Sequence, residues 1–191
     1  MNHFGNNMSI QSEQLLEEQN FFLKNQFWQL SIAAAFSRAN VYKKTGDQAK
    51  SIENHRNRFK QELFEYVNDS LIPHIEKENG SSESLLSAIL DIQNFSKKAF
   101  NDFLEGGELK IGVCQKIINL YLKYLWCAQL IDFTPPHFPL DRMIQEKTIK
   151  KVLVNWTEMT EIKDTELSYD TIINKLYTNE DKAEWELKSY N

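Results

Sequence analysis

The chain has 191 residues, 41% of them hydrophobic and 26% charged, which is the composition of an ordinary globular protein with a core of its own. Its net charge of −5 argues against bulk electrostatic attraction to nucleic acid, and no apolar run reaches the length of a membrane span. Only 6 glycines and 4 prolines leave few tight turns, which favours helices over strands.

The first predicted helix begins at Ser12, after a loose arm over residues 1–9, and runs to about Tyr42 or breaks near Ser37. A turn over residues 43–47 then leads into a second helix, which continues to about Ser70 until Pro73 bends or ends it. The face of the first helix repeats at spacings of three and four residues: Leu15, Leu16, Gln19, Phe22, Leu23, Gln26, Phe27 and Leu30.

The segment from residue 38 to residue 60 is basic within an acidic chain, with seven cations against two acids and hence a local charge of +5. The seven cations are Arg38, Lys43, Lys44, Lys50, Arg56, Arg58 and Lys60. A solvated helix face explains such a run as readily as a surface that binds phosphate.

Residues 78–82 form the clearest linker, and Ser81 or Ser82 caps a strongly amphipathic helix that reaches about Phe103. Gly106 and Gly107 stop that helix and precede a central one, the most apolar long segment of the chain. A helix, a glycine turn and a second helix are what a helix-hairpin-helix needs, although many α-hairpins share this order.

The central helix, over about residues 112–128, carries Lys116 and Lys123 two turns apart on nearly the same side. Both lysines could simply extend their amines to water along an apolar surface. The alternative is an amine held in a cleft as a nucleophile. The next loop contains three prolines, whose fixed φ angles make its path rigid, and it ends on Asp141, which is expected to cap the following helix.

That helix is expected to continue to about Val154, and residues 142–151 form a second basic segment, with four cations against one acid. Two small helices follow near residues 167–177 and 183–187. No strand pattern of any length is present, so the predicted fold class is all-α. We expect one helical domain over residues 1–191 with two lobes. Lobe one would comprise about residues 12–78 with the C-terminal helices, and lobe two about residues 81–155 with the hairpin and the site.

Two stretches resemble a known family, the helix-hairpin-helix DNA glycosylases. Residues 112–119 (GVCQKIIN) are similar to the hairpin and second helix of that family, and residues 138–144 (FPLDRMI) to the segment with its catalytic aspartate. The spacing of the two lysines is closest to the archaeal 8-oxoguanine glycosylase branch. Two features depart from the family: Cys114 stands where the hairpin usually has its second glycine, and the interval from lysine to aspartate is longer.

The resemblance implies that Lys116 is the amine nucleophile and Asp141 the carboxylate beside the sugar, with duplex DNA containing a modified base as the partner. Residues near this pair are candidates for substrate binding: Gln115, Asn119, Lys123, Trp126, His137 and Phe138. Candidates for contacts with the nucleic-acid backbone are Gly112, Arg142, Lys147, Lys150 and Lys151. The two cysteines and four histidines show no zinc spacing, so neither a metal nor a cofactor is expected.

Two functions therefore stay open from the sequence. The first is a DNA glycosylase, with or without lyase activity, that acts as a cytoplasmic monomer. The second is a non-catalytic, all-helical protein-interaction module in which Lys116 reaches solvent and Asp141 only caps a helix.

Overall fold

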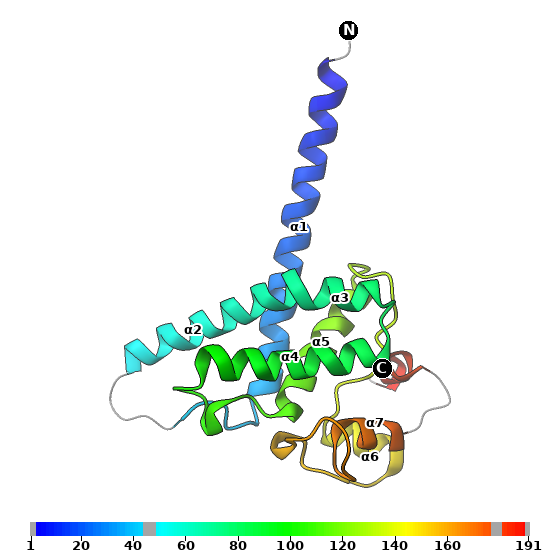
Figure 1. The fold of residues 1–191 in the computed structure, drawn as a ribbon. Coiled ribbons are helices and arrows are strands. Elements are labelled where there is room, and N and C mark those ends of the chain that lie inside the picture. Colours follow the sequence, from blue (N-terminus) through cyan, green and yellow to red (C-terminus); the bar gives the residue numbers. More distant parts are fainter. Residues whose placement is uncertain (1–2, 44–48, 177–180, 190–191) are drawn as a thin grey trace.

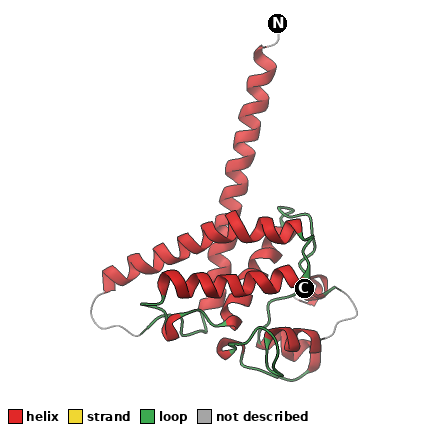
Figure 2. Ribbon diagram, viewed as in Figure 1, coloured by secondary structure: helices red, strands yellow, loops and turns green. Residues whose placement is uncertain are grey.

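The structure, a computed structural model, describes residues 3–43, 49–176 and 181–189, and it describes side chains from residue 11 and, after the gap, from residue 53. These residues form helices joined by loops, and their only β-type pairing is one isolated bridge between Tyr42 and Leu104 (Figure 2). The prediction of an all-α fold is confirmed. The longer elements are α1 (His3–Phe36), α2 (Ala49–Tyr66), α4 (Ser82–Phe100) and α5 (Ile111–Cys127). The shorter ones are η1 (Val67–Leu71), α3 (Ile72–Lys77), η2 (Glu105–Gly107), α6 (Arg142–Ile149), η3 (Trp156–Glu158), α7 (Tyr169–Lys175) and α8 (Lys182–Ser189).

Helix α5 is the centre of the fold, as its apolar sequence predicts. Its side chains are buried on most sides because α1 packs along one face and α4 along another (Figure 1). Aromatic rings carry the contact with α1: Trp28 meets Tyr121 edge-on at 5.4 Å between ring centroids, and Phe27 stacks on Tyr124 at 5.6 Å. Such ring pairs add to the stabilisation that burial already provides.

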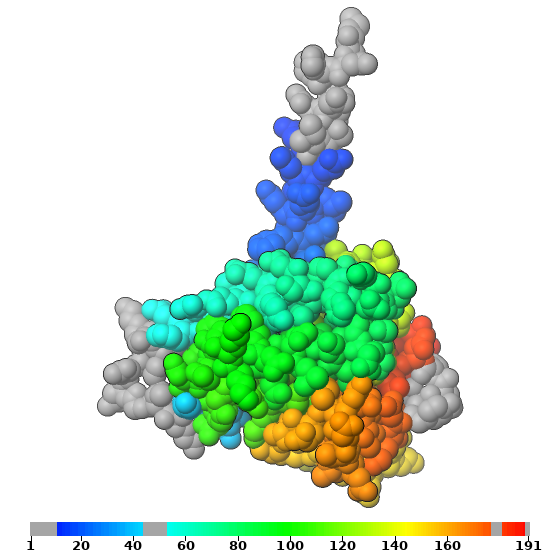
Figure 3. All heavy atoms as spheres, viewed as in Figure 1, coloured from blue at the N-terminus to red at the C-terminus, as the bar shows by residue number. Residues whose placement is uncertain are grey.

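Helix α1 is longer at its start than the sequence predicts. It begins at His3, so the expectation of a loose arm is wrong for residues 3–9, while residues 1–2 lie outside the described part of the chain. It ends at Phe36, which agrees with the predicted break near Ser37 and not with a continuation to about Tyr42. Its N-terminal half projects from the rest of the molecule (Figures 1 and 3). The predicted turn over residues 43–47 lies mostly outside the described residues.

Pro73 does not end the second helix. One π turn (η1) joins α2 to α3, and Pro73 lies in the first turn of α3, where its missing N–H costs little. The chain reverses after Lys77, where Gly80 has φ +66 and a Cβ would lie 2.2 Å from the Phe133 ring, so only glycine fits. Ser81 then caps α4 by accepting a hydrogen bond from the Ser84 amide at 3.1 Å.

Helix α6 ends at Ile149, five residues before the expected end, because Lys150 takes the left-handed conformation at φ 56. The Gln145 side chain then holds the chain that follows, accepting from the Leu153 and Val154 amides at 2.8 and 3.1 Å. This arrangement directs η3 back against the start of α5.

The C-terminal helices lie against α5. Tyr169 of α7 hydrogen-bonds Asn119, and Glu186 of α8 pairs with Lys123. In the sequence-based division these helices belong with residues 12–78. The observed contacts instead join them to the segment that carries the candidate site.

Candidate functional site

Gln115 fixes the proline loop onto α5. Its side-chain amide accepts from the Leu140 backbone N–H at 3.0 Å and donates to the Leu140 carbonyl at 2.8 Å. It also donates to the Gly112 carbonyl at 2.9 Å, and the whole residue is buried. Two hydrogen bonds to one backbone residue set both its position and its orientation. Lys116 and Asp141 come next in the chain after Gln115 and Leu140, so the same contact aligns them.

Lys116 and Asp141 form an ion pair at the edge of the interior. The amine Nζ lies 3.2 Å from Oδ2 of Asp141, and the two side chains are 12% and 16% exposed. The other carboxylate oxygen, Oδ1, accepts from the Ile144 amide at 3.0 Å and so caps α6, as the sequence predicts. The carboxylate thus has one oxygen fixed by the backbone and the other directed at the amine.

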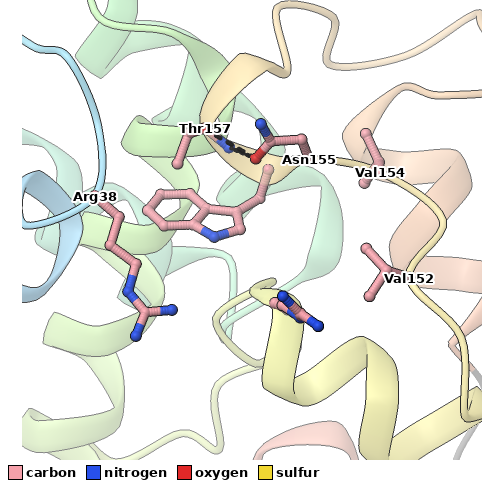
Figure 4. Close-up of a pocket in the computed structure, with 7 residues that line it drawn as sticks. Arg38, Val152, Val154, Asn155 and Thr157 are labelled. Atoms are coloured by element: carbon pink, nitrogen blue, oxygen red, sulfur yellow. Dashed lines mark hydrogen bonds between the residues drawn. The ribbon is translucent and has the colours of Figure 1, made fainter.

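Trp156 lies beside this pair and joins it to a hollow in the surface. The Lys116 amine lies 4.4 Å from the centre of the indole ring, a cation–π contact. The same tryptophan lines a hollow of about 500 Å³, together with Arg38, Arg142, Val152, Val154, Asn155 and Thr157. Figure 4 shows Arg38 reaching toward the hollow from one side, while Val152 and Val154 face it from the other.

His137 belongs to a buried chain of polar groups and not to an accessible surface. One ring nitrogen lies 2.8 Å from the Ser82 hydroxyl and the other 3.1 Å from the Tyr169 hydroxyl. Burial, with a smaller effect of Lys182, lowers the pKa of His137 to about 3, so the ring is neutral near pH 7. The Tyr169 hydroxyl also accepts from the Asn119 side chain at 3.0 Å. This chain ties α4, α5 and α7 to the loop.

The candidate substrate residues do not share one surface. Gln115, Asn119, His137 and Phe138 are buried, so in this structure they build the support of the site and do not line it. Lys123 pairs with Glu186 at 3.0 Å, and Trp126 is half-buried against the core. Of the predicted catalytic and substrate-binding residues, Lys116 and Asp141 are the two that meet at the edge of the interior.

The candidate backbone contacts are also divided. Gly112 is not available to phosphate, because its amide donates to the Met159 carbonyl at 3.1 Å and a Cβ there would lie 1.5 Å from the Trp156 carbonyl oxygen. Arg142 is exposed, pairs with Glu146 at 2.7 Å and lines the hollow. Lys147 donates to the Ser189 carbonyl at the C-terminal end of α8. Lys150 and Lys151 are exposed.

The two basic segments meet at one place. Arg38, from the first, and Arg142, from the second, line the same hollow. Other cations of the first segment have partners of their own: Arg56 stacks over the Tyr42 ring at 4.5 Å, and Arg58 pairs with Glu62 at 2.5 Å. Lys44 lies outside the described residues.

Three residues at or near the site were not predicted from the sequence: Trp156, Arg38 and Glu186. Trp156 follows a short irregular stretch with no periodic signal, and Arg38 is more than 70 residues from either member of the pair. Glu186 sits on a short amphipathic helix whose partner face cannot be read from its own sequence. Burial raises the pKa of Glu186, while Lys123 opposes that change.

Among the residues that the structure describes, no group of three His, Cys, Asp or Glu side chains is placed to hold a metal ion. Within the same residues, no helix has the length and apolar character needed to cross a membrane. No family model matches the sequence, and neither the curated proteins nor the solved structures contain a significant match to the chain.

Proposed function

We propose that this protein is a DNA glycosylase that removes a modified base by using the Lys116 amine as nucleophile and the Asp141 carboxylate as its partner. The observation that carries the proposal is the 3.2 Å contact between the two groups, both mostly shielded from water and both aligned by Gln115. The resemblance of residues 112–119 and 138–144 to the helix-hairpin-helix glycosylases names the same two residues. The proposal includes a hairpin of that type, made by α4, η2 and α5.

The geometry suits an amine that must attack a carbon atom. An ammonium has no free electron pair, so Lys116 must first lose a proton, and its hydrogen bond to Oδ2 of Asp141 provides the path. The neutral nitrogen then bonds to C1′ of the deoxyribose as the bond from C1′ to the base breaks. The base leaves with that electron pair and takes the proton that Asp141 accepted from Lys116. The Asp141 carboxylate is therefore ionised again as the bond to the base breaks, and it stabilises the positive charge that develops on the sugar.

The covalent product decides between simple base removal and strand cleavage. After the base has left, Lys116 is joined to C1′, and opening of the sugar ring gives an imine. Water can hydrolyse this imine and release the enzyme. Loss of a proton from C2′ with departure of the 3′ phosphate instead cuts the strand. We propose that both outcomes are open to this site, because the same lysine leads to each.

The hollow beside Trp156 is the proposed place for the displaced nucleotide. Its volume of about 500 Å³ falls within the usual size of ligand pockets, and its lining combines an indole, two valines and two guanidinium groups. A flipped base would contact the apolar side, and the flanking phosphates would lie near Arg38 and Arg142. The net charge of −5 repels DNA overall, so contact with phosphates requires a local group of cations such as Arg38 and Arg142.

The test is release of a base from randomly modified duplex DNA. Lys116→Gln keeps a side chain of similar length and polarity but has no nucleophilic amine, so folding and DNA binding should persist while base release falls by at least about a hundredfold. Lys123 is the matched lysine, yet Lys123→Gln alone would leave Glu186 buried without its cation partner. The control is therefore Lys123→Gln with Glu186→Gln, which should remain active. Base release by Lys116→Gln at the wild-type rate would refute the proposal.

A non-catalytic protein-interaction module is the alternative, and one observation favours it. The projecting half of α1 exposes large apolar side chains, with Leu15, Leu16, Phe21 and Phe22 each between 54% and 61% exposed. Exposed apolar surface of this kind commonly marks a contact with another protein. A failure to release any base, together with capture of a protein partner that depends on these residues, would make this the better account.

A further inference from the structure

Helix α1 has one face that is buried against the rest of the molecule and an opposite face that is exposed. Trp28, Ile32 and Ala35 are buried on the side that meets the rest of the molecule, and Phe21 packs on Phe64 with ring centroids 6.1 Å apart. The opposite side carries a stripe that begins in the projecting half and continues over the body. At 3.6 residues per turn the stripe spans roughly 120° of the helix surface. It consists of Leu15, Leu16, Gln19, Phe22, Leu23, Gln26, Leu30 and Ala33.

The stripe is apolar and lacks charge. Leu15, Leu16, Phe22 and Leu30 are 54%, 55%, 61% and 54% exposed, although such residues contribute stability only when they are covered. The three acids of the projecting half, Glu13, Glu17 and Glu18, lie beside or behind the stripe. An isolated helical segment of this length is marginal in water, so its apolar face requires a partner. The acids disfavour an anionic membrane surface as that partner.

The order of the apolar residues suits a second copy of the same helix. Around Gln19 the positions read alike in both directions: Leu16 and Phe22 lie three residues away, and Leu15 and Leu23 lie four residues away. We propose that two copies of this chain pair through α1 in antiparallel orientation, with the two Gln19 side chains meeting at a two-fold axis. A two-fold interface must be self-complementary, and this arrangement places Leu15 beside Leu23 and Leu16 beside Phe22 of the second copy.

The exposed residues in the second half of α1, where the helix packs on the rest of the molecule, agree with this arrangement. In the antiparallel pair, the first part of one α1 runs along residues 23–33 of the other, and there Gln26, Leu30 and Ala33 are exposed. Among the residues whose side chains are described, the stripe therefore stays open from Leu15 to Ala33 except at Leu23, which is half-buried. The central glutamines can hydrogen-bond each other, and a single polar layer of this kind fixes the register of paired helices. The protein is then a dimer, in contrast to the monomer expected from its sequence.

Disulfide formation between engineered cysteines tests both the pairing and its direction. Gln19→Cys and Gln26→Cys are matched changes on the same stripe, made with Cys127→Ser because Cys127 is exposed. In the antiparallel pair the two copies of position 19 face each other, whereas the two copies of position 26 are separated by roughly 21 Å along the helix. Gln19→Cys should therefore cross-link under mild oxidation at micromolar concentration, and Gln26→Cys should not. Cross-linking of both would indicate parallel pairing, and cross-linking of neither would indicate no pairing; each result would overturn the proposal.

Sedimentation gives a second readout that needs no cysteine. The wild-type chain should sediment at twice its 22.5 kDa mass at micromolar concentration. Leu16→Glu should weaken association by at least about tenfold, because it places a carboxylate against an apolar partner, without lowering the helix content. Gln14→Glu adds the same charge at an exposed position outside the stripe and should leave the dimer intact. A monomeric wild-type protein, or equal effects of the two variants, would refute the proposal.

Discussion

The loop of residues 134–141 and the projecting half of α1 differ in what holds them. The loop has no regular secondary structure, yet side chains of α4, α5, α7 and α8 bind it: Gln115 holds Leu140, Ser82 and Tyr169 hold His137, and Trp185 packs on Phe138. Residues 11–22 of α1 are fully helical, yet nearly all of them are exposed. Regular structure and tertiary support are thus separate properties here. The well-supported segment carries the candidate catalytic carboxylate, and the poorly supported one is suited to a partner.

The largest effect is expected when the support of the loop at Gln115 is removed. Gln115→Leu keeps the approximate volume but leaves the Leu140 N–H and carbonyl buried without partners, so it should cost about 2–5 kcal/mol of unfolding free energy. Chemical denaturation measures the change. Gln14→Ala, at an exposed site of α1, is the matched control and should change stability by less than about 0.5 kcal/mol. Similar effects of the two variants would contradict the account of the loop.

The buried histidine predicts a pH dependence of stability. The pKa of His137 is lowered to about 3 in the folded chain, while a histidine in the unfolded chain has its ordinary pKa of 6.5. Below pH 6.5 the unfolded state binds a proton on His137, whereas the native state keeps the ring neutral down to about pH 3. The free energy of unfolding therefore falls as the pH drops toward 3, by at most about 1.4 kcal/mol per pH unit. Thermal melts across this range measure the slope. His137→Gln should flatten it, and an unchanged slope in that variant would rule out His137 as its source.

A smaller effect is expected where the two basic segments meet. Arg38→Ala and Arg142→Ala should each weaken duplex binding by roughly threefold to tenfold and reduce the dependence on salt, since each removes one cation near phosphate. Arg58→Ala, which removes a cation outside the hollow, should change affinity less. Binding titrations at several salt concentrations measure these differences. Equal losses in all three variants would contradict a common binding surface at the hollow.

The smallest effect is expected in the projecting half of α1. Leu16→Ala should change the unfolding free energy of the monomer by no more than about 0.5 kcal/mol, because the Leu16 side chain is 55% exposed and its loss leaves no cavity in the core. Leu122→Ala removes the same side chain from the buried face of α5 and should cost about 2–5 kcal/mol. Denaturation at concentrations below those of association compares the two. A large loss in Leu16→Ala would show that the chain itself covers this stripe.

Local sequence signals predicted several elements correctly. The all-α class, the central place of α5, the Ser81 cap and the Asp141 cap all follow from apolar periodicity and from capping residues, which act over a few positions. The end of α6 was missed because a lysine, Lys150, takes the left-handed conformation there, and the chain after it is held by Gln145 through a contact to Val154 that forms only when the chain folds back. The start of α1 was missed because asparagine and glycine near residues 5–7 indicate a loop on propensity alone.

The site was only partly predictable because it depends on contacts between residues that are far apart in the sequence. Lys116 and Asp141 are separated by 25 residues and were linked by the resemblance, whereas their alignment depends on Gln115, which local reasoning placed at the substrate. The burial of Asn119 and His137 is set by Tyr169, about 50 and 32 residues away. Trp156 and Arg38 reach the hollow through tertiary packing alone. Patterns along the chain do not encode such distant contacts.

Trapping the covalent intermediate tests the role of Lys116 as nucleophile directly. Borohydride added during reaction with modified duplex DNA reduces an imine between lysine and C1′ to a stable bond, and peptide mapping by mass spectrometry then locates the modified residue. We expect a DNA adduct on Lys116, no adduct in Lys116→Gln, and an adduct retained in the variant with both Lys123→Gln and Glu186→Gln. An adduct on any other residue, or base release without a trapped adduct on Lys116, would contradict the assignment.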